Sequence, residues 1–161
     1  MSTVQALPYT IAPLAAEAIA SALPLIEAYL LASKLPVRFN PEKVERYWLS
    51  LYGLGCGQLF GLTIEGQLVG VLGVHVVESM FGDGQAVNEW VWWIDPAYRA
   101  SGGGLALLET AEAWARAKGL GLIVGAYEAL NGPLMARLYR RRGYVAQGGF
   151  YLKTWTEAQH G

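Results

Sequence analysis

The sequence has 161 residues, the length of one ordinary globular domain. Hydrophobic residues make up 53% of the chain and charged residues only 16%, against about 25% charged residues in a typical soluble domain. This balance excludes a disordered chain, and the net charge of −1 argues against a nucleic-acid partner, which would favour a basic surface. We expect one folded domain over residues 1–161.

The apolar composition raises the question of a membrane segment. The longest uncharged run lies between Arg46 and Glu65 and has the length of a spanning helix. Glycines and polar residues interrupt this run, so it favours a helix end followed by a strand. No basic residue precedes the apolar N-terminal stretch, which argues against a signal peptide. We expect a cytoplasmic protein without a membrane partner.

The single cysteine, Cys56, cannot form an internal disulfide. No histidine or second cysteine stands beside it at the spacing of zinc ligands, so the sequence indicates no metal site. We interpret Cys56 as a small buried thiol.

The predicted elements combine helices with a run of short strands. Asn40 and Pro41 supply an N-cap and a first-turn proline, which predict a helix start. In chain order we predict a strand at 3–7, a helix at 12–34 with a kink or break at Pro24, a helix at 41–52, strands at 58–64, 67–78 and 86–94, a helix at 102–118, a strand at 122–127, a helix at 133–142, and strands at 144–146 and 150–154.

The order β-α-α-β-β-β-α-β-α-β-β predicts an α+β fold. Glycine turns between the strands of residues 58–94 indicate an antiparallel meander. The strand–helix–strand unit over 86–127 adds one parallel pair. We therefore expect a mixed, mostly antiparallel central sheet flanked by helices.

Three consecutive glycines, Gly102, Gly103 and Gly104, open the helix that follows a strand and a proline turn. Each costs roughly 1 kcal/mol relative to alanine, which suggests that something approaches the backbone closely there. Free amides at a helix start bind anions, and Arg99 lies just before them, so a phosphate or pyrophosphate is the natural guest. A flexible turn is the alternative.

Two other phosphate loops fail the comparison with this segment. A P-loop ends in Gly-Lys-Ser/Thr, but Leu105 follows Gly104 here. A Rossmann turn places its glycines directly after the strand, whereas seven residues separate Ile94 from Gly102.

At this loop the sequence resembles the GCN5-related N-acetyltransferase (GNAT) family. The family's Arg/Gln-x-x-Gly-x-Gly/Ala hallmark is met by Arg99, Gly102 and Gly104. The resemblance continues through the helix LALLETAEAWARAKG, the strand LIVGAY, Asn131 and the run from Leu138 to Tyr144, and it covers residues 86–152. In general character the chain is also similar to acetyltransferase-like proteins encoded in phage and prophage genomes.

The resemblance implies acetyl-coenzyme A as cosubstrate, with no metal. The glycine amides and the loop of residues 99–101 would hold the pyrophosphate, and the strand edge near residues 92–94 would pair with the pantetheine arm and polarise the thioester carbonyl. Asn131 would contact the arm, or act as an N-cap, or both. The residues so assigned are Trp92, Trp93, Ile94, Arg99, Ala100, Ser101, Gly102, Gly103, Gly104 and Asn131.

Two positions depart from the family pattern. Ser101 stands where the family often has a basic residue, so one phosphate contact is missing. Ala100 replaces a frequent glycine. The basic run that ends at Arg142 favours a solvated helix C-terminus, although one of its arginines could touch the ribose phosphate.

Acyl transfer from a thioester to an amine needs a base, oxyanion donors and an acid. Tyr139 occupies the family's acid position, with a packed core tyrosine as the alternative. Glu89 is the candidate base, directly or through water, unless it faces solvent. A bulge could exchange its role with that of Asn88, and His75 on the neighbouring strand has a suitable pKa but is also typical of a structural histidine.

Large aromatic residues cluster on the strand before the glycine loop. Simple alternation places Trp90 and Trp92 on one face and Trp93 on the other. One of them, with Phe81 and Phe150, could line an apolar acceptor pocket.

The sequence thus predicts an N-acetyltransferase that acts on an amine of a small molecule or a protein by direct attack in a ternary complex. The alternative is a non-catalytic GNAT-fold binding protein. The apolar helix at 12–34 leaves two further roles open, as an acceptor wall or as the interface of a homodimer.

Overall fold

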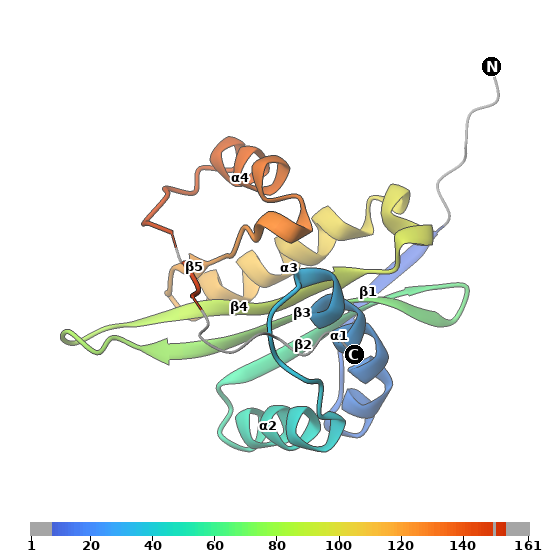
Figure 1. Ribbon diagram of the computed structural model, residues 1–161. Helices are drawn as coiled ribbons and strands as arrows, with labels where there is room; N and C mark the ends of the chain where they lie inside the picture. The colour runs from blue at the N-terminus through green and yellow to red at the C-terminus, as the bar shows by residue number, and fades with distance from the viewer. Residues whose placement is uncertain (1–7, 150, 154–161) are drawn as a thin grey trace.

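A five-stranded sheet forms the centre of the protein (Figure 1). The computed structural model describes residues 8–149 and 151–153. The strands are paired in the order β1-β2-β3-β4-β5, antiparallel except for the parallel pair β4 and β5. Their bounds are β1 Tyr9–Pro13, β2 Gly57–Ile64, β3 Gln67–Glu78, β4 Gln85–Ile94 and β5 Leu122–Ile123.

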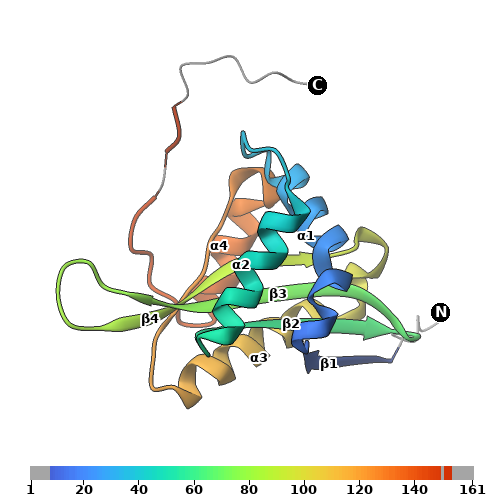
Figure 2. The same ribbon diagram turned by 90° about the horizontal axis from the view of Figure 1, so that it is seen from below.

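Helices cover both faces of this sheet. The helices α1 (Ile19–Ser33) and α2 (Pro41–Gly53) lie on one face, and α3 (Gly103–Ala117) lies on the other, with α4 (Gly132–Arg141) beyond it (Figures 1 and 2). Short 3-10 turns are η1 Ala16–Ala18, η2 Pro96–Ser101 and η3 Glu128–Leu130. The predicted mixed, mostly antiparallel α+β fold is confirmed.

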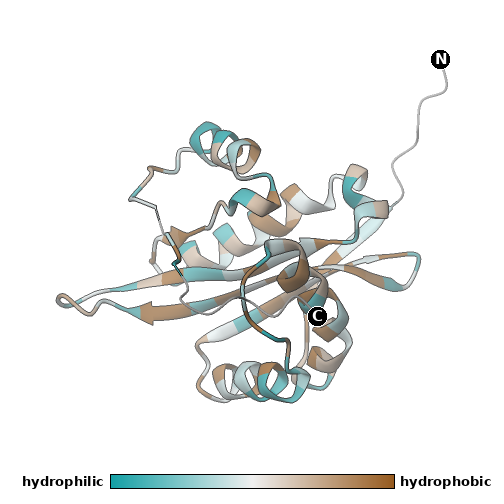
Figure 3. Cartoon of the chain, in the orientation of Figure 1, coloured by the Kyte–Doolittle hydropathy of each residue, from teal (hydrophilic) through white to brown (hydrophobic). Residues whose placement is uncertain are grey.

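The alternation of side chains along the strands divides the core into two clusters, one on each face. Under α3, Leu107 and Ala111 pack on sheet residues such as Leu62 and Leu72. Under α1 and α2, the sheet side chains contact a second set, which includes Ile19, Ala22, Ile26, Tyr29, Trp48 and Leu51. Figure 3 shows β3 coloured mostly as hydrophobic and α2 mostly as hydrophilic, as expected for a two-sided central strand and an amphipathic cover.

The start of α2 forms as predicted. Asn40 is the N-cap, and its side-chain oxygen accepts a hydrogen bond of 2.9 Å from the Lys43 amide. Pro41 takes the first helical position, where its missing N–H costs nothing.

The first helix is shorter than predicted. Residues 12–18 are not part of it, because β1 pairs with β2 up to Pro13 and Leu14 then bonds to Leu59. From Ile19 the helix continues through Pro24 without a break. The strand predicted at 3–7 lies outside the described residues.

The C-terminal strands also differ from the prediction. The strand predicted at 122–127 ends at Ile123, where the chain leaves β4. No strand forms at 144–146, where the Tyr144 hydroxyl donates to Glu112 on α3. Of the strand predicted at 150–154, both ends lie outside the described residues, and 151–153 has no strand.

An ion pair fixes the end of α4 against α3. Arg142 donates to both carboxylate oxygens of Glu112, at 3.0 and 2.6 Å, and lies 3.4 Å from Glu109. The Arg142 hydrogen bonds hold the pKa of Glu112 below its usual value. The last arginine of the basic run is therefore engaged in structure, in a bidentate geometry that fixes orientation as well as charge.

Among residues 8–149 and 151–153, one segment, Ala16–Ser33, is long and apolar enough to cross a membrane, with a mean hydropathy of 1.3. Core helices of soluble proteins pass the same test, so this is weak evidence for a membrane segment. Within it, Ile19 and Ala22 are fully buried against the sheet, whereas Leu31 is 71% exposed. The exposed apolar surface of the chain thus includes Leu31 near the end of α1.

Leu107 tests this arrangement of the core, because it is fully buried whereas Leu105 on the same helix is 43% exposed. We expect Leu107→Ala to lower the free energy of unfolding by roughly 2–5 kcal/mol, since truncation leaves a cavity. Leu105→Ala is the matched control and should change it by about 0.5 kcal/mol or less. Urea unfolding followed by circular dichroism measures both, and equal losses would contradict the placement of α3.

Candidate active site

Strand β4 carries one extra residue relative to β3. Gly73 is paired with Val91, but the next residue, Val74, is paired with Glu89, so Trp90 has no partner on β3. Such a β-bulge interrupts the alternation of side chains. Its effect is visible in the core, since Val87 belongs to the cluster under α3 and Val91 to the cluster under α1 and α2.

The bulge brings Glu89 and Trp92 to the same face of the sheet. Without it, residues three apart on a strand would face opposite sides. With it, Glu89 shares the face of Val87, and Trp92 packs against the same cluster, with its ring 6.4 Å from that of Tyr139 on α4. The predicted common face for Trp90 and Trp92 is therefore wrong: Trp90 lies with Tyr47 on the α2 side.

The sheet opens next to Glu89. Strand β5 is paired with β4 only at Val87 and Asn88, and the chain after Ile123 departs. Gly125 then donates its N–H to Oε2 of Glu89 at 3.3 Å and accepts the hydroxyl hydrogen of Tyr139 at 2.9 Å. The predicted base and the predicted acid are thus hydrogen-bonded to the two sides of one glycine.

The surroundings of this pair shift both side chains toward their neutral forms. Burial raises the pKa of Glu89 to about 7, although the Gly125 N–H opposes the shift. Burial, and then the nearby charge of Glu89, raise the pKa of Tyr139. The same two causes raise the pKa of Tyr29, whose ring lies edge-on to Tyr127 at 6.4 Å. Tyr139 therefore stays protonated near neutral pH, while Glu89 is poised to exchange a proton.

After Asn88, the last residue of β4 that pairs with β5, the edge of β4 that faced β5 has no partner strand among the described residues. The Asp95 N–H donates to the Val69 carbonyl at 2.8 Å, so it points toward β3. Because backbone groups alternate sides along a strand, the amides of Trp92 and Ile94 point the other way, into the opening.

The three glycines of the loop are explained within the chain itself. Gly102 has φ +82°, the left-handed conformation that glycine favours. A Cβ on Gly103 would lie 2.6 Å from Leu62, and one on Gly104 would lie 2.9 Å from Ile94. The close approach predicted for these glycines is that of α3 to the sheet. The first-turn amides of α3 still lack acceptors within the helix.

The side chains beside this loop are engaged in the protein. Arg99 donates through Nε to the Ile94 carbonyl at 3.1 Å, and its guanidinium lies 4.6 Å above the ring of Trp93. Ser101 accepts the Gly103 N–H at 3.2 Å, and Ala100 is exposed. These contacts fix the path of the loop.

Asn131 begins α4 through its backbone. Its φ of 61° is left-handed, and its carbonyl accepts from Leu134 and Met135. The side chain makes no capping hydrogen bond, so the N-cap role predicted for it is wrong as far as the side chain is concerned.

Other predicted candidates lie elsewhere. His75 and Asn88 are paired with each other, and His75 contacts Trp90 and Tyr47 on the α2 side, away from Tyr139. Phe81 is 94% exposed, and Phe150 lies outside the described residues. Within residues 8–149 and 151–153, no group of three or more metal-ligating side chains is present.

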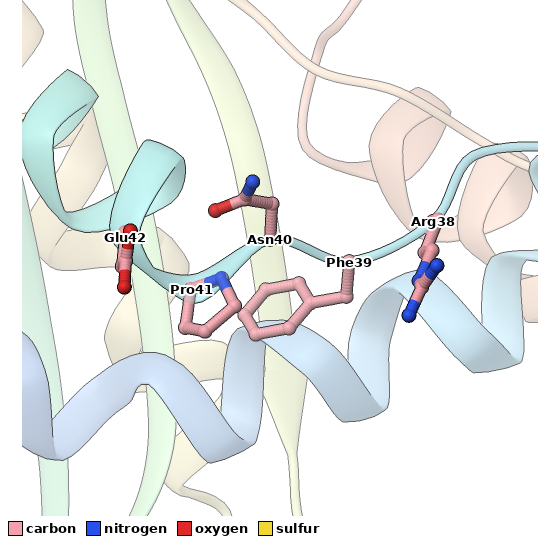
Figure 4. Close-up of a pocket in the computed structure, with 5 residues that line it drawn as sticks. All are labelled: Arg38, Phe39, Asn40, Pro41 and Glu42. Carbon is pink, nitrogen blue, oxygen red and sulfur yellow. The ribbon is translucent and has the colours of Figure 1, made fainter.

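Two residues of the opening have no clear sequence signal. Gly125 lies in an apolar run that is typical of a regular strand, and Tyr29 lies in a helix of low amphipathicity. A pocket, drawn in Figure 4, lies in the segment that leads into α2, away from the glycine loop in sequence. It is lined by Arg38, Phe39, Asn40, Pro41 and Glu42.

A family model described as "Acetyltransferase (GNAT) family" matches residues 26–144. The chain belongs to the GNAT family. No curated protein matches the sequence. The resemblance carried by Arg99, Gly102 and Gly104 is thus confirmed at the level of the family.

Solved structures agree with this GNAT assignment. A predicted acetyltransferase from Clostridium acetobutylicum, solved with acetyl-CoA, has a TM-score of 0.75 at 11% identity and covers 95% of this chain and 100% of its own. A ribosomal-protein-alanine N-acetyltransferase from Brucella melitensis has a TM-score of 0.67 at 19% identity and covers 92% of this chain and 100% of its own. An aminoglycoside acetyltransferase from an uncultured soil metagenomic sample has a TM-score of 0.70 at 16% identity and covers 93% of this chain and 100% of its own. These similarities establish the fold.

The raised pKa of Glu89 makes the stability of this GNAT protein depend on pH. The folded chain holds this proton up to about pH 7, whereas the unfolded chain releases it near 4.5, so wild-type stability falls as pH rises through that window. Glu89→Gln has no charge to desolvate, and we expect its stability relative to the wild type to grow by about 3 kcal/mol between pH 4 and pH 8. Urea unfolding at pH 4 and pH 8 measures it. An advantage that does not change with pH would contradict a desolvated carboxylate.

Proposed function

We propose that this GNAT protein is an N-acetyltransferase that transfers the acetyl group of acetyl-CoA to an amine by direct attack in a ternary complex. The observation that carries the proposal is the pair of hydrogen bonds that link Glu89 and Tyr139 to the two sides of Gly125. This pair lies where β4 loses its β5 partner, so a base and an acid flank an unpaired strand edge.

The coenzyme would lie along that edge. The amides of Gly102, Gly103 and Gly104 at the start of α3 suit the pyrophosphate, and the Gly103 N–H would leave Ser101 to bind it. The outward amides of Trp92 and Ile94 suit the pantetheine arm and the thioester carbonyl. Asn131, whose exposed side chain is not used as a cap, is available to the arm.

In the proposed reaction, the Glu89 carboxylate takes a proton from the acceptor ammonium. The amine nitrogen then attacks the thioester carbon, and the developing oxyanion is stabilised by the Trp92 N–H. This attack forms the C–N bond, and collapse of the tetrahedral intermediate then restores the C=O bond and breaks the C–S bond. The departing thiolate takes the Tyr139 proton, and the remaining proton on nitrogen restores the tyrosine through water. Glu89 releases its proton to solvent.

The proposed acceptor class is a primary amine. Similar structures are named for ribosomal-protein alanine and for aminoglycosides as acceptors, and both carry amino groups. Amines are protonated near neutral pH, so a base of pKa about 7 is well matched to removing that proton.

A second candidate is a GNAT-fold binding protein without catalysis. It is favoured by the glycine loop, where Arg99 is bonded to Ile94 and Ser101 to Gly103, which leaves the pyrophosphate with backbone amides as its main donors. Mass spectrometry of an amine panel incubated with isotope-labelled acetyl-CoA and the protein separates the two. Coenzyme binding without any labelled amide supports the binding protein.

Coenzyme binding is measured independently of turnover. A ligand that binds the folded chain alone raises stability by about 2.7 kcal/mol at 100 times its dissociation constant. Titration with coenzyme A followed by thermal unfolding therefore reports on the α3 site. The absence of both stabilisation and calorimetric binding would refute the proposal.

For Glu89 as the base, kcat/KM should rise with pH through about 7, as the carboxyl loses its proton. We expect Glu89→Gln to lower kcat roughly 10²–10⁴-fold and to remove this limb, with coenzyme A affinity unchanged. Glu78→Gln is the control, because Glu78 is exposed and bonds to Gln85 at the far end of β3. A wild-type profile in Glu89→Gln would exclude this carboxyl as the base.

For Tyr139 as the acid, we expect Tyr139→Phe to lower kcat roughly 10²-fold while coenzyme binding persists. Tyr144→Phe is the matched control, because its ring lies 5.5 Å from that of Tyr139 but its hydroxyl bonds to Glu112. Steady-state rates with saturating acetyl-CoA measure both. Equal rates for Tyr139→Phe and the wild type would show that the tyrosine is a packing residue.

A further inference from the structure

A separate aromatic cluster lies on the α2 side of the sheet. Tyr47 of α2, His75 of β3 and Trp90 of β4 have ring centroids 5.3–6.4 Å apart. The Trp90 indole N–H donates to Nε2 of His75. His75 is buried, whereas Trp90 is 49% exposed. Neither residue contributes a contact to the Glu89–Tyr139 pair described above.

Trp90 is the extra residue of the β4 bulge, so its side-chain contacts bear on the backbone there. The bulge leaves Trp90 without a partner on β3, while His75 sits one residue beyond the shift, paired with Asn88. The hydrogen bond between the two side chains thus joins the bulged residue to the partner strand. It replaces the ladder contact that the bulge removes.

The face of Glu89 depends on this bulge. A regular register would pair Trp90 with Val74 and Glu89 with His75, and it would turn Glu89 to the α1 and α2 side. The observed register turns Glu89 toward Gly125. Whatever stabilises the bulge therefore positions the carboxyl.

We propose that His75 and Trp90 are positioning residues whose hydrogen bond holds the β4 bulge and so keeps Glu89 in the opening beside Gly125. The inference rests on the proposed function for its meaning in catalysis, because it assigns Glu89 as the group being positioned. Its structural content, the dependence of Glu89 on a bond on the opposite face, is testable without turnover.

The bond requires a neutral imidazole, since Nε2 must accept and Nδ1 then carries the hydrogen. Burial lowers the pKa of His75, so the neutral form persists near neutral pH. The titratable neighbours are Tyr47 on α2, whose pKa is raised by burial, and Cys56, whose backbone bonds to Val76. Tyr47 therefore carries no charge at neutral pH that would compete for the imidazole.

Two variants remove the bond while keeping the rings. Trp90→Phe deletes the donor at a half-exposed position, and His75→Phe deletes the acceptor. His75→Gln is the conservative variant, because its amide oxygen can accept from the indole. Tyr47→Phe is the matched control, since it keeps the ring contact and takes no part in the bond.

The first readout is the pKa of Glu89, measured by NMR of its side-chain carboxyl carbon in protein labelled at glutamate. The Glu89 signal is identified by its loss in Glu89→Gln. We expect the pKa to fall from about 7 toward 4.5 in Trp90→Phe and His75→Phe, because the carboxyl gains water when the bulge relaxes. It should stay near 7 in Tyr47→Phe and return toward 7 in His75→Gln.

The second readout is kinetic. Trp90→Phe and His75→Phe should each lower kcat at least tenfold, with the coenzyme A dissociation constant unchanged within about twofold, because the glycine loop lies elsewhere. The double variant should lose no more than either single one, as expected for a shared bond. Coenzyme binding and circular dichroism confirm folding, and Trp90→Phe carries the test alone if His75→Phe does not fold.

The positioning role of His75 and Trp90 and the role of Glu89 as base can be refuted separately. An unchanged Glu89 pKa in folded Trp90→Phe overturns the positioning role, whatever the activity. Full activity in Glu89→Gln overturns the proposed base but leaves the NMR result to decide the positioning role. A lowered pKa together with lowered kcat supports both.

Discussion

The extra residue in β4 is the constraint on which the candidate site depends. Strand residues alternate faces, and the two core clusters require that alternation on either side of Trp90. Inserting one residue lets Val87 and Val91 enter different clusters without disturbing either. The same insertion turns Glu89 and Trp92 to one side, so a carboxyl and an outward amide meet at one edge.

Gly125 links the bulge to the helices beyond the sheet. After two residues of β5 the chain leaves β4, and the amide that would continue the ladder bonds to the Glu89 side chain instead. The carbonyl of the same residue accepts from Tyr139, which joins α4 to the opening. Burial makes the Glu89 carboxyl costly to ionise, and it lies where β4 and β5 separate. Carboxyl groups with strongly shifted pKa values are typical of functional sites.

Local signals were sufficient for much of the fold and for the family. Asn40 and Pro41 fix a helix start through contacts within four residues, and Arg99, Gly102 and Gly104 form a motif that local spacing reveals. The face predicted for Trp90 is wrong because the alternation of side chains along a strand is interrupted at a bulge. The strand predicted at 144–146 is absent, and Tyr144 instead bonds to Glu112, 32 residues away, a contact that no local pattern encodes.

The glycines of the loop show why a motif and its physical cause must be separated. Their presence suggests a ligand close to the backbone, yet a Cβ on Gly103 would lie 2.6 Å from Leu62 and one on Gly104 would lie 2.9 Å from Ile94. Close packing of α3 on the sheet therefore accounts for small residues at this helix start without a ligand. A side chain at Gly103 would require the buried Leu62 side chain or the start of α3 to shift, whether or not a ligand is bound. The glycine motif therefore has a structural cause in the packing of α3 on the sheet, apart from any role in binding an anion.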